Sequence, residues 1–171
     1  MSGLVADTHA EQDIGRDAEL VLSFLNTLDV EAGTDVLTDE AGWREWAQAS
    51  ALRVAGDLDH ARQARDALRA AVGDPATGHD VPLLNSLIAV RLPGGVPTLA
   101  AGDPVGQVLA ACVRLAVLGQ WDRMKICPAE NCRWAFFDHS RNRSRTWCSM
   151  QVCGNRTKAR VWRERSRARP A

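Results

Sequence analysis

The sequence predicts a mostly α-helical fold, in which a helical N-terminal domain over residues 14–122 precedes a small cysteine-rich module over residues 123–169. Apolar residues recur at helical spacing through the first part, as is typical of amphipathic helices around one core. Four of the five cysteines lie beyond residue 123. The charge changes sign at the same place. Residues 1–120 hold 8 Lys/Arg and 17 Asp/Glu, a net charge of −9, whereas residues 121–171 hold 13 and 4, a net charge of +9. These observations predict two parts of different composition.

The first two helices are predicted from their apolar faces. After roughly ten N-terminal residues that we expect to be disordered, apolar residues from Ala18 onward recur along one helix face. Asp39 is placed to cap a second helix, which carries Trp43 and Trp46. The two indoles lie three residues apart on one face, which is more typical of a core than of a binding site.

Three further helices complete the expected domain. The third begins at Asp57 or Asp59 and stops at Gly73-Asp74-Pro75. A fourth is expected over residues 81–90, where leucine and isoleucine share one face. Gly94-Gly95 then marks a turn, around which a short β-hairpin is also expected. Asp103-Pro104 begins a last helix with strong apolar periodicity.

The C-terminal module is expected to contain one short strand and one basic helix. Trp134, Phe136 and Phe137 form an aromatic run suited to the strand. A polar, arginine-rich loop follows over residues 139–145. The helix runs from Asn155, a candidate cap, to about residue 167, and Val161 with Trp162 is expected to dock it onto the module. A module of this size needs a metal in addition to its aromatic residues in order to fold.

The clustered cysteines predict that metal. They form a C-x4-C…C-x4-C frame with a fifteen-residue spacer: Cys127, Cys132, Cys148 and Cys153. The N-terminus lacks a secretory segment and no apolar run would span a membrane, so we expect a cytoplasmic protein with reduced thiols. Four thiolates complete a tetrahedral zinc site with no open position, which predicts one structural Zn²⁺. The alternative is a set of ordinary reduced cysteines. Cys112 stands alone in an apolar helix pattern and is expected to be a buried small hydrophobe.

Arginines surround this frame and predict a polyanionic partner. In the last helix they recur at i, i+4, i+7 and i+11, which places them in one stripe, and the loop adds three more at alternate positions. DNA is the expected partner, since such a stripe suits phosphate contacts. The residues expected to contact it are Arg141, Arg143, Arg145, Asn155, Arg156, Lys158, Arg160, Arg163 and Arg167. Some arginines are also expected to balance the negative charge of a four-thiolate zinc site.

Three alternatives to a DNA partner remain open. The basic segment could be a solvated tail without a partner. An RNA-binding module would stack exposed bases on Trp134, Phe136 or Trp147. A protein-interaction adaptor would instead use the acidic N-terminal half as its docking surface.

The same residues resemble a known family. The segment from Cys127 to Arg167, which includes Cys153-Gly154-Asn155-Arg156 and the D-x-S-R-N-x-S-R loop from Asp138, is very similar to the CGNR zinc finger. Residues 24–47, above all the Phe-Leu-Asn-Thr-Leu-Asp stretch, resemble the ABATE domain that precedes that finger. The resemblance implies a bacterial, stress-related transcription regulator with a DNA-binding zinc module. His139 and Thr146 depart from the pattern expected for the loop.

Functions for the helical domain follow less directly. Asn26 and Thr27 are polar positions in an apolar helix pattern, and with Trp43 and Trp46 they are candidates for lining a small-molecule effector pocket; the alternative is local capping and core hydrogen bonding. No paired carboxylates, nucleophile–base pattern or phosphate-binding loop predicts an enzyme. A homodimer is also considered, because one small finger offers limited contact area.

Overall fold

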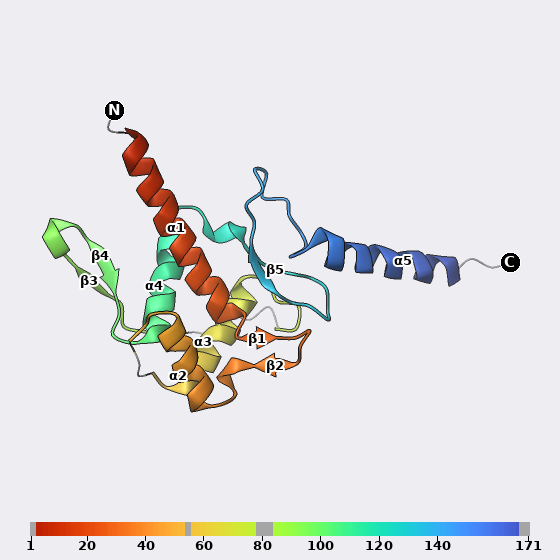
Figure 1. Ribbon diagram of the computed structural model, residues 1–171, viewed down its shortest axis with the longest axis horizontal. Coiled ribbons are helices and arrows are strands. Elements are labelled where there is room, and N and C mark those ends of the chain that lie inside the picture. Colours follow the sequence, from red (N-terminus) through yellow and green to blue (C-terminus); the bar gives the residue numbers. More distant parts are fainter. Residues whose placement is uncertain (1–2, 54–55, 78–83, 168–171) are drawn as a thin grey trace.

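The computed structural model describes residues 3–53, 56–77 and 84–167, and it is mostly helical (Figure 1). Within these residues there are five α-helices: α1 (Gly3–Leu25), α2 (Glu40–Ala49), α3 (Leu58–Ala71), α4 (Pro104–Val117) and α5 (Asn155–Arg167). The described strands form three antiparallel hairpins, which pair β1 (Leu28–Asp29) with β2 (Thr34–Asp35), β3 (Ala89–Arg91) with β4 (Thr98–Ala100), and β5 (Met124–Ile126) with β6 (Ala135–Phe137). Short 3-10 turns cover Val36–Thr38 (η1), Pro93–Gly95 (η2) and Trp121–Arg123 (η3), and a π-helical turn (η4) covers Met150–Gly154.

The first four helices surround one apolar core. α1 and α4 lie side by side along most of their length, and α2 and α3 pack beneath them (Figure 1). Phe24 and Leu25 of α1 and Val105, Val108 and Leu115 of α4 are fully buried there. The two indoles of α2 stack with ring centroids 5.3 Å apart, and Phe24 packs against both. The predicted helical core is therefore present, with both tryptophans inside it.

Aspartates begin three of these helices, as predicted. The carboxylate of Asp39 accepts hydrogen bonds from Ala41 N and Gly42 N at 2.9 Å each. Asp57 and Asp103 act in the same way at the starts of α3 and α4. These contacts span three residues or fewer, so the local sequence alone is enough to place them.

Two predicted features of the helical part are wrong. Helix α1 begins at Gly3, so residues 3–10 are helical rather than disordered; Leu4, Ala6 and Ala10 are good helix formers that continue the helix. The helix expected over 81–90 is also wrong. Residues 84–88 have no regular structure and Ala89–Arg91 is a strand, while residues 81–83 lie outside the described part. The expected β-hairpin is confirmed instead, because Gly94 and Gly95 take up the positive φ angles of its turn, 61° and 82°.

The β5–β6 hairpin belongs to two cores at once. Met124, Ile126, Ala135 and Phe137 are buried against the helices. Phe136, which points to the opposite face of β6, is buried with three of the cysteines. The apolar packing therefore continues from the helical part into the cysteine module through this hairpin.

Candidate metal centre and basic surface

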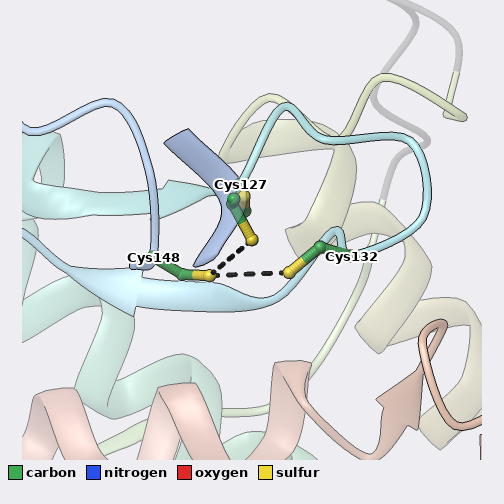
Figure 2. Close-up of side chains that lie close together, drawn as sticks. Cys127, Cys132 and Cys148 are labelled. Atoms are coloured by element: carbon green, nitrogen blue, oxygen red, sulfur yellow. Dashed lines mark hydrogen bonds between the residues drawn. The ribbon is translucent and has the colours of Figure 1, made fainter. Parts of the chain in front are cut away.

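The four cysteines lie in separate places along the chain that meet beside the hairpin. Cys127 directly follows β5, Cys132 ends the turn that leads to β6, Cys148 lies three residues after the arginine-rich loop, and Cys153 lies in η4 before α5. Their four Sγ atoms all lie within 4.8 Å of one another. Figure 2 shows the side chains of Cys127, Cys132 and Cys148 pointing toward one another. The frame seen in the sequence is thus one cluster in space.

The distances within the cluster fit a metal and not a disulfide. The Sγ atom of Cys148 lies 3.5 Å from that of Cys132 and 3.6 Å from that of Cys153. A disulfide needs about 2.05 Å, whereas a tetrahedron of Zn–S bonds of about 2.3 Å places its sulfurs about 3.8 Å apart. Four soft sulfur donors at this spacing are the donor set that zinc prefers. The protein therefore has one structural zinc site made of the four predicted cysteines.

Backbone turns hold each ligand pair. The N–H groups of Cys132 and Arg133 both donate to Ala129 O, at 2.8 and 3.1 Å, and Arg133 has a left-handed φ of 53°. In the second pair, Cys153 N donates to Ser149 O at 2.9 Å. A turn of this kind closes each C-x4-C segment so that its two thiols face the same point.

The pKa values of the thiols describe the same crowding. Burial and the neighbouring sulfurs raise the pKa of Cys148, and they raise that of Cys153 to about 11. Burial also opposes ionisation of Cys127, but hydrogen bonds to its sulfur from the N–H groups of Cys148 and Ala129 and from the thiols of Cys153 and Cys148 together lower its pKa. Four thiolates this close repel one another, and the dication supplies the positive charge that lets them ionise together.

A buried carboxylate fixes the arginine-rich loop beside this site. Asp138 has no exposed surface, and it accepts hydrogen bonds from Lys125 Nζ at 2.7 Å, Arg145 N at 2.9 Å and Ser140 N at 2.9 Å. Burial alone would raise the pKa of Asp138, but these donors hold it well below its usual range. Sequence reasoning gave this aspartate no role of its own, although it opens the D-x-S-R-N-x-S-R motif.

Arg145 connects the loop to the ligands. Its Nε donates to Trp147 O at 2.9 Å, its Nη2 donates to Cys148 O, and its guanidinium carbon lies 4.9 Å above the ring of Phe136. Arg145 is therefore engaged within the metal module, and the expected balancing of the zinc site's charge by arginines stays a prediction. Phe136 is buried beneath it, so this ring is not free to stack on a base.

The remaining predicted nucleic-acid residues are exposed, and they differ in their partners. Arg143 pairs with Asp122 at 3.3 Å, Arg156 with Glu31 at 2.8 Å and Arg160 with Glu164 at 3.8 Å. Four others are exposed and form no ion pair with any described residue: Arg141, Lys158, Arg163 and Arg167. Helix α5 extends away from the rest of the molecule (Figure 1). The basic surface, defined here as the loop 141–145 together with α5, is therefore largely open.

The start of α5 differs from the prediction in two ways. Asn155 is the first helical residue, with φ −71° and ψ −38°, and not the cap; Ser149 instead accepts a hydrogen bond from Val152 N at the start of η4. Trp162 is 70% exposed, so its expected docking onto the module is wrong, and only Val161 is partly buried. One turn of π-helix between Ser149 and Asn155 moves the cap away from the residue that local sequence favours.

Polar residues of the helical part bind the cysteine module directly. Asn26 Nδ2 donates to Ala135 O at 3.0 Å, and Ala135 N donates to Asn26 Oδ1 at 2.8 Å. The buried carboxylate of Asp74 accepts from Arg69 Nε at 2.7 Å and from Arg133 Nε and Nη2 at 2.7 and 2.9 Å. Sequence reasoning did not find this triad, one member of which, Arg133, directly follows the zinc ligand Cys132.

The four positions suggested for an effector pocket make ordinary structural contacts. Asn26 pairs with β6 as described, and Thr27 is buried with its hydroxyl donating to Phe24 O at 2.7 Å. Trp43 Nε1 donates to Gly56 O, and Trp46 Nε1 donates to Ser23 Oγ. These contacts are those of the core hydrogen bonding named as the alternative, and the pocket stays a prediction.

Comparison with known proteins agrees with these two parts. A family described as "Putative stress-induced transcription regulator", ABATE, matches residues 18–119, and the family of the CGNR zinc finger matches residues 123–166. A search of curated proteins finds no match. No helix of the described ranges is long and apolar enough to cross a bilayer. Because the ABATE model matches more than half of the chain and the zinc-finger model matches the cysteine module, the chain belongs to the ABATE family and carries a CGNR zinc finger.

Proposed function

We propose that the protein is a DNA-binding transcription regulator whose zinc module presents the basic surface to the DNA backbone. The observation that carries the proposal is the set of exposed cations on α5 and the loop, held by a metal site and a buried aspartate. The first 120 residues carry a net charge of −9, which keeps a polyanion away from the helical part and directs it to the basic surface. The closed four-thiolate site leaves no position for an activated water, so the metal acts through structure.

The contacts of the arginines divide them into those used within the protein and those available to DNA. Arg145 and Arg133 are used internally, by the carbonyl groups near Cys148 and by Asp74. Arg156, Arg160 and Arg163 line one hollow between α5 and residues 129–131. Because they lie on one helix face, we assign to them the main phosphate contacts. The helical part would then regulate the module through the shared hairpin, in the cytoplasm.

The test is duplex DNA binding measured as a function of salt. If the basic surface meets about four phosphates, log K falls with log salt with a slope of about −3.6. The triple variant Arg156→Ala, Arg160→Ala, Arg163→Ala should weaken binding and make the slope shallower by up to about 2.7. A matched control removes three exposed arginines from the acidic part: Arg16→Ala, Arg44→Ala and Arg53→Ala. Equal behaviour of the two triple variants, or binding without salt dependence, contradicts the proposal.

A further inference from the structure

The face of α5 opposite the arginine stripe carries a second, chemically different hollow. It has a volume of about 360 Å³, and its lining includes Trp147, Gly154, Lys158, Val161, Trp162 and Arg165. Trp162 is 70% exposed, the largest value among the exposed large hydrophobic side chains of the zinc module. Lys158 and Arg165 lie four residues before and three residues after it, so both cations are on its face of the helix. The hollow thus combines an exposed indole with a cation on each side.

The charged residues that line this hollow differ from those that line the hollow beside the arginine stripe. The stripe side includes Glu130, and Arg156 there is paired with Glu31. The described lining of the Trp162 hollow holds two cations and no carboxylate, and neither Lys158 nor Arg165 pairs with an acid in the described part of the chain. This side of α5 is therefore complementary to an anion that also offers a flat apolar face.

Gly154 and the metal site position the second indole. A Cβ atom at position 154 would lie 2.5 Å from Met150 Sδ and 3.3 Å from Trp147 Cδ1, so the absence of a side chain at Gly154 lets Met150 and Trp147 pack against its backbone as they do here. Trp147 directly precedes the ligand Cys148, and its carbonyl accepts from Arg145. The half-buried indole of Trp147 is therefore held in place by the zinc module, and the exposed indole of Trp162 is held by helix α5.

We propose that this hollow binds an unpaired DNA base, which stacks on Trp162 while Lys158 and Arg165 contact the flanking phosphates. This inference rests on the proposed function and adds the kind of DNA that is bound: a strand with at least one unstacked base. An indole beside cations is the usual platform for single-stranded nucleic acid, because every base has a π-face and every linkage an anion. The apolar side chains that line the hollow are two indoles, Trp147 and Trp162, and Val161, and flat aromatic faces suit stacking on a base.

The experiment compares one sequence as single-stranded DNA, as duplex, and as duplex with a central unpaired bubble. Trp162→Ala should weaken binding to the single strand and the bubble by about 5- to 100-fold and leave the duplex almost unchanged. The salt slope should stay the same, because no charge is removed. Trp162→Phe should retain most of the affinity. Lys158→Ala with Arg165→Ala should make the single-strand slope shallower by about 1.4.

Controls separate this result from unfolding and from failure of the proposed function. Trp162 is exposed, so each variant should retain one zinc per chain. Trp134→Ala removes another exposed indole of the module that does not line this hollow, and it should not change single-strand affinity. Unchanged single-strand binding by Trp162→Ala, with salt-dependent duplex binding intact, overturns the base site and leaves the proposed function standing. No binding of the wild-type chain to any DNA overturns both.

Two other partners of the hollow are outcomes of the same design. A Trp162 effect that is larger on RNA of the same sequence than on DNA overturns the DNA assignment. Retention on anionic phosphatidylglycerol vesicles that depends on Trp162, without any effect on the single strand, assigns the indole to a lipid surface and likewise overturns the proposal.

Discussion

The side chain of Asn26 pairs with the backbone of Ala135 as a neighbouring strand would. Its amide donates to Ala135 O at 3.0 Å and its carbonyl accepts from Ala135 N at 2.8 Å, across 109 positions of sequence. Ala135 is buried in β6, whose next residue, Phe136, packs with the cysteines. One carboxamide at the end of α1 therefore satisfies the free edge of the strand that joins the two cores.

This pairing predicts a large stability effect for a small substitution. Asn26→Ala leaves both a buried N–H and a buried C=O of Ala135 without a partner, so it should lower the free energy of unfolding by about 2–4 kcal/mol. Urea denaturation of the zinc-loaded chain measures it. Asn142→Ala, at an exposed position, is the matched control and should cost less than about 0.5 kcal/mol. Equal midpoints for the two variants would show that the pair contributes nothing to stability.

Zinc removal should destabilise the helical part as well as the module. The residues of the β5–β6 hairpin are divided between the two cores. Loss of the metal therefore removes the packing on one face of the hairpin, whose other face packs on α1. Chelation, or Cys148→Ser with Cys153→Ser, should lower the Tm of the whole chain, as followed by far-UV circular dichroism. Metal analysis should find about one zinc in the wild type and less in the variant.

Cys112→Ala is the control for that experiment. Cys112 is buried in α4, where burial raises the pKa of its thiol to about 12, and it lies outside the cluster. This variant should retain one zinc per chain and lose only the small packing contribution of its sulfur. A Tm that is unchanged on chelation would show that the helical core does not depend on the hairpin.

The Asp74 triad predicts an acid-sensitive link. Burial alone would raise the pKa of Asp74, but hydrogen bonds from Arg133 and Ala76 N and the charges of Arg69 and Arg133 lower it overall. A lowered folded-state pKa contributes stability that is fully present above the ordinary aspartate value of about 3.9 and is lost as the pH falls through the folded value. Stability at pH 7 should therefore exceed stability below about pH 4.

Asp74→Asn should remove the part of the acid dependence that Asp74 contributes and cost about 3–5 kcal/mol at pH 7, because two arginines lose their shared buried carboxylate. Urea midpoints measured from pH 7 down to about pH 3 give both quantities. Asp13→Asn is the matched control: this carboxylate is 69% exposed and pairs with Arg16 on the surface. An Asp74→Asn curve parallel to the wild-type curve would contradict the assignment.

Sequence patterns predicted the parts of the fold that short spacing determines. Asp39, Asp57 and Asp103 cap helices through contacts within three residues, and the C-x4-C frame holds its ligands in two local turns. Each of these signals is contained in the segment that it describes. The tertiary fold is needed only to bring the two ligand pairs together into one cluster.

Other features depend on partners far along the chain. Asp74 reads in sequence as part of a helix stop, yet its carboxylate binds Arg133 across 59 positions. Asn26 reads as a polar lining of a pocket, although it binds a strand. Leu87 suggests a buried helix face, but its side chain is 86% exposed shortly before the β3–β4 hairpin. Whether a residue is polar or apolar does not indicate which distant group it will contact in the folded chain.

The contact between Glu31 and Arg156 predicts that the helical part restrains DNA binding. Glu31 lies in the turn between β1 and β2, and its Oε1 atom is 2.8 Å from Arg156 Nη1 at the start of the stripe. Since an exposed pair of this kind is worth at most about 1 kcal/mol, Glu31→Gln should raise duplex affinity by up to about fivefold. The salt slope should become more negative by up to about 0.9, to the extent that Glu31 keeps Arg156 from its phosphate in the wild type. Glu45→Gln, an equal charge change on the exposed face of α2, should have a smaller effect. Lower affinity in Glu31→Gln than in Glu45→Gln would mean that Glu31 orients Arg156 for DNA rather than competing with it.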